Sequence, residues 1–159
     1  MSEFKKIIPF FAAAIGIILL GGFLSQGKIP PITPDGNKFL KINETRVRVE
    51  LADTESLRKK GLSGRDSLDE DSGMLFVFDS KDVRTAFWMK DTKIALDFIW
   101  INDGKVSQIT DGVQPEPNTP DNQLKIYTPD AAIDYMLEVN AGFVQKNNIK
   151  VGDSVDLTQ

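Results

Sequence analysis

The stretch that decides the fold is FWMKDTKIALDFIWIN, residues 87–102. Its second half, residues 95–102, is apolar at nearly every position, and Asp97 is the exception on an otherwise apolar run. A short apolar run bounded by polar residues is typical of a buried strand, because a core helix is usually longer. Residues 84–89 form a second apolar run before the polar residues 90–92. The stretch therefore predicts two β-strands joined by a polar turn.

Further strands are predicted on both sides of this stretch. Residues 45–52, TRVRVELA, alternate between apolar and charged side chains, which is typical of a strand with one buried face. Asp103 and Gly104 predict a hairpin turn, since glycine adopts the positive φ that such a turn requires. The remaining predicted strands are residues 73–78, 105–110, 133–139 and 154–157.

Two short helical segments interrupt these strands. Asp53 or Thr54 can cap a helix that ends at Gly61, and residues 141–148 predict a helical turn. Several short strands separated by turn residues favour a mainly β fold, a small barrel or sandwich with one or two short helices. We predict that this globular domain spans residues 45–159.

The N-terminal segment predicts a membrane anchor. Residues 7–24 contain no charge, and eighteen residues in a helix are about long enough to cross a bilayer. Lys5 and Lys6 precede them, which indicates a cytoplasmic N-terminus and a domain outside the cytoplasm. We predict a single transmembrane helix within an anchor of residues 1–24, followed by a flexible tether over residues 25–44. If the segment is instead a cleaved signal peptide, the domain is secreted or periplasmic.

Composition restricts the chemistry. The chain has no Cys and no His, which excludes disulfides, thiolate nucleophiles and the commonest general base near neutral pH. The acidic run DSLDEDSG, residues 66–73, does not match the ligand spacing of an EF-hand loop, so we predict no metal site and no cofactor. The net charge of −4 and the absence of a basic run in the domain argue against a nucleic-acid partner.

Asp97 is the first candidate for a functional side chain. A buried carboxylate must be paired, hydrogen-bonded or protonated, because an isolated charge in an apolar setting is costly. Arg58, Arg65 and Lys90 are the candidate partners. Asp97 is then either an acid or base with a shifted pKa or one half of a structural salt bridge.

Trp88 and Glu138 extend the candidate site. Trp88 and Lys90 lie on the strand face opposite Phe87 and Met89, where an exposed indole could stack on a sugar or grip a peptide. The alternative is that Trp88 covers the mouth of the barrel. Glu138 could combine with Asp97 as two weak catalytic candidates for glycosidase chemistry. The predicted ligand site consists of Arg65, Trp88, Lys90, Asp91, Thr92, Asp97 and Glu138.

Several ordered blocks resemble one family. VELADTESLRKKGLSGRDSL, GMLFVF, FWMKDTKIALDFIWIN, DGKV and YMLEVNAGFVQKNNIKVGD, within residues 47–155, are similar to the domain-of-unknown-function 192 family. The resemblance implies a small, largely β-stranded protein that is often exported or membrane-anchored, and it implies no activity. Asp91 stands where the family usually has Asn, and Ser63 stands where it favours Met.

These observations lead to three functional hypotheses. The first is a membrane-tethered module outside the cytoplasm that binds a glycan or a peptide in a polar and aromatic groove. The second is a hydrolase or transferase that uses the carboxylates of Asp97 and Glu138. The third is an assembly partner of a membrane protein complex, without a small ligand.

Overall fold

The computed structural model describes residues 38–157, and the predicted membrane anchor lies outside this range. Among the described residues, no helix has both the length and the apolar character needed to span a membrane. The described chain folds into a seven-stranded sheet in the order β5-β4-β6-β3-β2-β1-β7. The strands are β1 (Lys38–Ile42), β2 (Thr45–Ala52), β3 (Ser72–Val77), β4 (Leu96–Asn102), β5 (Lys105–Val113), β6 (Tyr135–Asn140) and β7 (Val155–Asp156).

The sheet curls into a nearly closed barrel. The short strand β7 pairs with the end of β1, and the residues just before β7 bond to the start of β5. Val106 donates its backbone N–H to Asp153 O at 2.9 Å, and Gly152 donates to Val106 O at 2.8 Å. The prediction of a mainly β fold is confirmed, and of the two alternatives, barrel and sandwich, the structure is a barrel.

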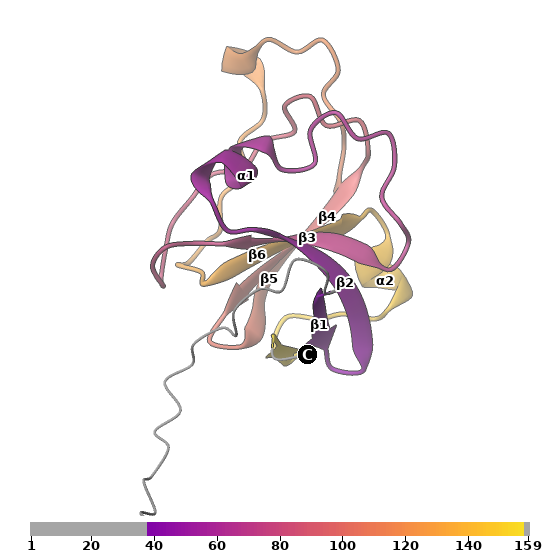
Figure 1. Ribbon diagram of the computed structural model, residues 1–159, viewed down its shortest axis with the longest axis vertical. Helices are drawn as coiled ribbons and strands as arrows, with labels where there is room; N and C mark the ends of the chain where they lie inside the picture. The colour runs from indigo at the N-terminus through magenta and orange to yellow at the C-terminus, as the bar shows by residue number, and fades with distance from the viewer. Residues whose placement is uncertain (1–37, 158–159) are drawn as a thin grey trace, which may run out of the picture. The chain divides into compact units, whose positions relative to one another are not determined.

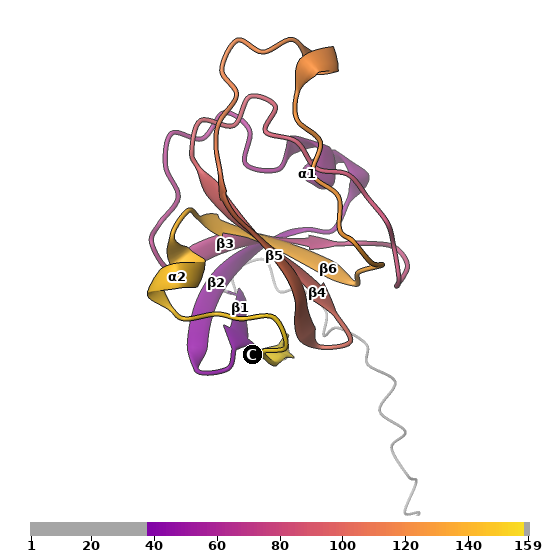
Figure 2. The same ribbon diagram turned by 180° about the vertical axis from the view of Figure 1, so that it is seen from behind.

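Two helices accompany the barrel, as expected. Thr54 caps α1 (Glu55–Lys60) by accepting the Leu57 N–H, and Gly61 ends the helix at a φ of 48°. The second helix, α2, spans Phe143–Lys146, and a 3₁₀ turn, η1, spans Asp121–Gln123. Figures 1 and 2 show α1 and the long loops gathered at one end of the barrel, with the β1–β2 turn at the other.

Two apolar layers follow from the alternation of side chains along the strands. The barrel core takes residues from all seven strands together with Phe143 and Val144 of α2. The outer cluster covers the other face of β3, β4 and β6, under the turn after α1 and the loops 78–95 and 124–133. Its buried members are Ala52, Leu62, Met74, Phe76, Met89, Leu96, Phe98, Trp100, Val113, Ile133 and Met136.

Two predicted elements differ from the structure. Residues 84–89 form no strand and only a single bridge between Phe87 and Tyr127, because this segment crosses the outer cluster instead of joining the sheet. Within the predicted tether, residues 38–42 form β1, with Leu40 and Ile42 buried in the barrel core. The tether prediction is therefore wrong for residues 38–44, because pairing with β2 orders five residues whose own alternation is weak.

Candidate functional site

Glu138 lies in the middle of the sheet with its side chain on the outer cluster. It belongs to β6, where its neighbours across the sheet are Met74 of β3 and Phe98 of β4. Its side chain is only 5% exposed. The sequence therefore places a carboxyl group in a layer that is otherwise apolar.

No hydrogen bond or ion pair from the described residues offsets the cost of burying this carboxyl group. Within residues 38–157, the Glu138 carboxyl group makes no hydrogen bond and no ion pair. Burial raises its pKa from 4.5 to about 8, because the charged form loses its hydration and gains no partner. At neutral pH the group is mostly protonated.

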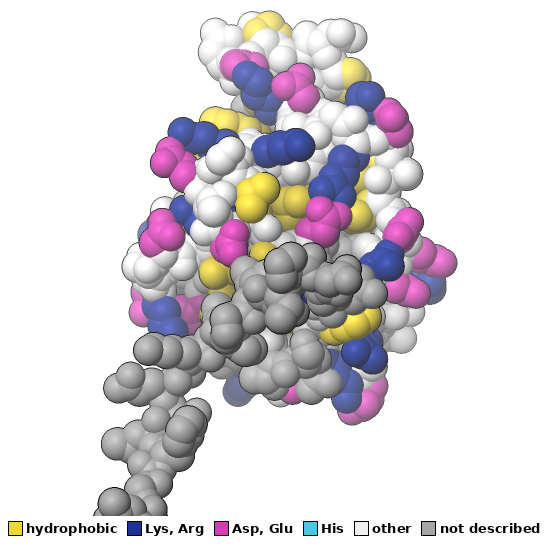
Figure 3. All heavy atoms as spheres, viewed as in Figure 1, with side chains coloured by type: hydrophobic (Ala, Val, Ile, Leu, Met, Phe, Trp, Pro, Cys, Tyr) yellow, Lys and Arg dark blue, Asp and Glu magenta, His cyan; other side chains and the backbone are white. Residues whose placement is uncertain are grey.

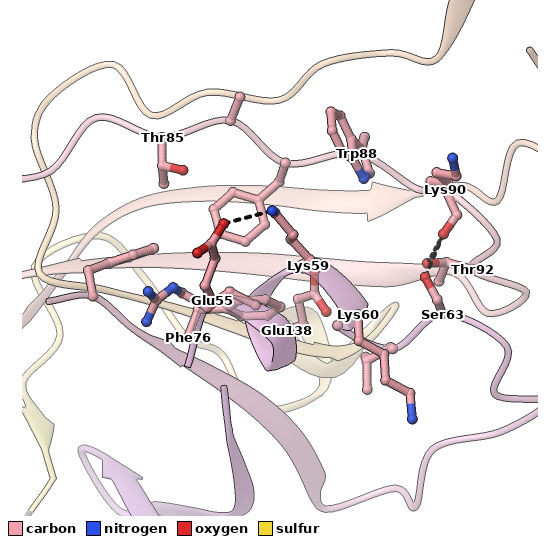
Figure 4. A pocket seen from close by; sticks show the side chains of 16 residues that line it. Glu55, Lys59, Lys60, Ser63, Phe76, Thr85, Trp88, Lys90, Thr92 and Glu138 are labelled. Atoms are coloured by element: carbon pink, nitrogen blue, oxygen red, sulfur yellow. Dashed lines mark hydrogen bonds and ion pairs between the residues drawn. The ribbon is translucent and has the colours of Figure 1, made fainter. Parts of the chain in front are cut away.

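Glu138 lines a pocket of about 250 Å³ that we call the Glu138 pocket. Figure 4 shows Thr85, Trp88 and Lys90 along one side of it, with α1 and the turn after α1 along the other. In the space-filling view, hydrophobic side chains are exposed between basic and acidic ones in the half of the barrel that carries α1 (Figure 3). The lining consists of Glu55, Arg58, Lys59, Lys60, Gly61, Leu62, Ser63, Phe76, Phe78, Thr85, Ala86, Phe87, Trp88, Lys90, Thr92 and Glu138.

Aromatic side chains form much of this lining. The rings of Phe76 and Phe87 meet edge to face with their centroids 5.0 Å apart. Trp88 is 50% exposed, whereas Met89, the next residue, is 1% exposed. The expectation that Trp88 faces away from the core, on the side opposite Met89, is confirmed.

Three of the four basic side chains that line the pocket, those of Arg58, Lys59 and Lys90, pair with carboxylates other than Glu138, and Lys60 is the fourth. The Arg58 guanidinium also donates to the backbone oxygens of Asp53 and Val77, so its position is fixed by three acceptors. The ion pairs at the rim are Arg58–Asp79, Lys59–Glu55 and Lys90–Asp121. Three ion pairs therefore lie at the rim of the pocket, and the carboxyl group of Glu138, which has no ionic partner, lies at its floor.

The turn at residues 89–92 is fastened to the turn after α1 through its backbone oxygens. Ser63 donates its hydroxyl to Lys90 O at 2.8 Å, and Thr92 donates to the same oxygen at 3.4 Å. Gly64 donates its backbone N–H to Asp91 O at 2.8 Å, and Asp91 adopts a φ of 55°. The contacts between these two turns thus use the carbonyl groups of residues 90 and 91, not their side chains.

A second hollow lies next to the first. Lys90 and Thr92 line both the Glu138 pocket and a hollow of about 520 Å³ beneath the loop that carries η1. Asp91 lines only this second hollow, together with residues 115–119 of the loop. Of the seven predicted site residues, five thus line one or both of these neighbouring hollows, which we together call the groove.

Asp97 lies outside this groove. Its side chain is fully buried on the barrel-core side of β4, opposite Val139. The carboxylate accepts the backbone N–H of Gly112 at 2.9 Å and that of Val144 at 3.0 Å. The prediction of an ionic partner is wrong, because Arg58, Arg65 and Lys90 all pair with other carboxylates.

The hypothesis of a two-carboxylate centre is also wrong. Phe98, not Asp97, pairs with Glu138 across the sheet, and adjacent residues of a strand face opposite sides. Asp97 therefore points into the barrel core while Glu138 points into the outer cluster. The two carboxyl groups cannot act on one substrate.

Arg65 lies outside the groove as well. Its guanidinium donates two hydrogen bonds to Glu50, at 2.5 and 2.6 Å. This bond and the charge of Arg65 lower the pKa of the Glu50 carboxyl group. The bidentate contact joins the turn after α1 to β2.

We expect Arg65→Ala to lower the free energy of unfolding by about 1 kcal/mol or less, because pairs near the surface are screened by water. Urea unfolding at low and high salt measures this value. Glu50→Ala should cost a similar amount, and the double variant should cost little more than either single variant. A loss several times larger would show that Arg65 stabilises more than this pair.

Some residues of the pocket escaped the sequence interpretation. The predicted ligand site omits Arg58, Lys59, Lys60 and Ser63, because a shared pocket with Glu138 is a tertiary feature. The sequence offers two signals: Ser63 departs from the pattern of the resembling family, and Arg58 is a candidate partner for a buried carboxylate.

The comparisons with known proteins agree with the fold. The family model DUF192, described as "Uncharacterized ACR", matches residues 38–157. A solved structure from Sinorhizobium meliloti 1021, provisionally named a transcription regulator, is similar at 30% identity and a TM-score of 0.65, over 74% of this chain and 89% of that one. A protein of unknown function from Novosphingobium aromaticivorans DSM 12444 is similar at 28% identity and a TM-score of 0.66, over 82% and 94%. No curated protein matches the chain.

Proposed function

The chain belongs to the domain-of-unknown-function 192 family, and from its groove we propose that the protein is a binding module for a glycan or a peptide. In this proposal residues 7–24 hold it at the membrane and the barrel lies outside the cytoplasm. The ligand occupies the Glu138 pocket and extends past Lys90 into the second hollow.

The unpaired Glu138 carries this proposal. Desolvation makes ionisation of this carboxyl group costly, and an apolar residue in its place would avoid that cost. Groups with strongly shifted pKa values inside a pocket are enriched at functional sites. A ligand that bonds to this carboxyl group accounts for its presence.

The shape and lining of the groove support a ligand of some length. The two hollows are neighbours that share Lys90 and Thr92, so a chain-like molecule that runs past these two side chains would contact both hollows. Trp88 offers a half-exposed indole at the edge of the first hollow, and large aromatic side chains dominate the energetics of many binding sites. The hydrolase and transferase hypothesis has less support, since Asp97 faces away from Glu138.

We expect Trp88→Ala to weaken ligand binding by at least about tenfold while the barrel remains folded, because half of this side chain is already in water. A thermal-shift screen with glycans and peptides, followed by titration of any hit, measures the loss. Ile126→Ala is the matched control, since Ile126 is also 50% exposed and lies outside both hollows.

Three outcomes of this screen are informative. A hit that Trp88→Ala weakens and Ile126→Ala does not would support the groove. A hit that both variants bind equally would place the site elsewhere. If no member of the panel binds, and a membrane protein co-purifies through a surface that Trp88→Ala does not affect, the assembly hypothesis replaces this proposal.

A further inference from the structure

The polar groups of the Glu138 pocket offer acceptors to a ligand. Ser63 and Thr92 both use their hydroxyl protons on the Lys90 carbonyl oxygen. A hydroxyl that donates its only proton has lone pairs left and can then only accept. Once ionised, the Glu138 carboxylate accepts as well. The pocket therefore suits a ligand group that donates several hydrogen bonds.

The apolar part of the pocket is electron-rich too. Phe76, Phe87 and Trp88 line it, and the faces of aromatic rings attract cations. A positively charged donor thus fits both the polar and the aromatic part of the lining.

Resting on the proposed binding function, we infer that the Glu138 pocket receives a primary ammonium group at the end of an aliphatic stem, as in a lysine side chain of a bound peptide. The stem lies against the aromatic side chains, and the ammonium group bonds to the ionised carboxylate of Glu138. The peptide backbone continues along the groove past Lys90.

The basic side chains around the pocket do not pair with Glu138, so a cationic ligand can. Across the sheet, the neighbours of Glu138 are Met74 and Phe98, which carry no charge. On α1, Arg58 is paired with Asp79, and Lys59 is paired with Glu55. In the loop before β4, Lys90 is paired with Asp121. Lys60 also lines the pocket, and Figure 4 shows its ammonium group directed away from Lys59 and the pocket floor. No described cation neutralises Glu138, and the ligand supplies one.

Binding of this kind is linked to a proton. An ammonium ligand needs ionised Glu138, while burial in the free protein holds the pKa of this group at about 8. Below pH 8 each binding event therefore releases about one proton, and the affinity should rise roughly tenfold from pH 6 to pH 7 and level off above pH 8. A neutral ligand that accepts a proton from Glu138 would show the opposite trend.

Isothermal titration of the full chain in detergent micelles tests the inference. The probes are an N-acetylated tripeptide amide with a central lysine, the same peptide with norleucine, 1,5-diaminopentane, and a neutral disaccharide. Titrations at pH 6, 7 and 8.5, each in two buffers of different ionisation enthalpy, count the protons released. We expect the lysine peptide to bind, the norleucine peptide to bind at least tenfold more weakly, and the pH profile to rise as stated. Comparison with the free diamine separates a peptide ligand from a small amine.

Two variants assign the effect to Glu138. Glu138→Gln should weaken the lysine peptide at least tenfold and abolish the pH dependence. Glu44→Gln, an exposed carboxylate at the β1–β2 turn, should change neither. Tighter binding of the norleucine peptide or the disaccharide would overturn the ammonium inference and leave the binding function standing, whereas no binding by any probe would count against both. Lysine-peptide binding that Glu138→Gln does not weaken would overturn the assignment to this pocket.

Discussion

Glu138→Gln is expected to make the protein more stable by roughly 3–5 kcal/mol above pH 8 and to leave its stability at pH 4 nearly unchanged. Glutamine has nearly the same shape as protonated glutamic acid and cannot ionise. The variant therefore removes the cost of a buried charge without creating a cavity. Few substitutions in an apolar layer stabilise a protein, so the direction of the effect is diagnostic.

The sign follows from the two pKa values of Glu138. In the unfolded chain the carboxyl group has its ordinary pKa of 4.5, while burial raises the pKa in the folded protein to about 8. Between these values the unfolded state loses the proton and the folded state keeps it. The stabilising contribution of the raised pKa is therefore complete below pH 4.5, and it is lost as the pH rises to 8, by about 1.4 kcal/mol per pH unit.

Urea unfolding of both proteins at pH 4, 6 and 8.5, followed by tryptophan fluorescence, measures this difference. Contributions from other carboxylates cancel when the two curves are subtracted, because only position 138 changes. A difference that stays constant across this range would show that Glu138 is ionised or paired in the folded protein. The proposed pocket would then lose its main support.

The strands were predictable where local pattern and tertiary environment agree. In β2 the alternation of Val47 and Val49 with arginines matches a strand with one buried face, and its bounds were predicted without error. Residues 84–89 have a similar apolar content, but they lie across the outer cluster, and their backbone bonds to other loops. A local pattern indicates that a segment is buried, and it does not indicate whether a neighbouring strand is available.

The candidate site was predictable in its members and not in its arrangement. Trp88, Lys90, Asp91 and Thr92 are close in sequence, so their common location follows from one turn. The position of Glu138 beside them depends on the register of β6 between β3 and β4, which pairs Glu138 with Phe98 and Met74, 40 and 64 positions away. The same register separates Glu138 from Asp97. The alternation within a strand does not reveal which residues of two strands pair, so the separation of these two carboxyl groups could not be predicted from the sequence.

Asp97→Ala is expected to lower the free energy of unfolding by roughly 2–4 kcal/mol, because it leaves one buried and one partly buried donor without their acceptor. The donors are the backbone N–H groups of Gly112 in β5 and Val144 in α2. Asp97 therefore holds the first turn of α2, whose Phe143 and Val144 belong to the barrel core, against the sheet. Asp111→Ala, an exposed neighbour of Gly112, is the control and should change stability by less than about 0.5 kcal/mol.

Hydrogen exchange can separate this structural role from a role in binding. If Asp97 only holds the backbone, Asp97→Ala should speed exchange at the amides of Gly112, Val144 and the rest of α2, whereas the amides of β3 keep more of their protection. Below its lowered melting temperature the variant should still bind any ligand of the Glu138 pocket, since the two carboxyl groups face opposite sides of the sheet. Loss of binding in a folded Asp97→Ala protein would mean that the barrel core and the pocket are coupled through β4. Unchanged exchange at Gly112 and Val144 would mean that other groups hold α2 in place.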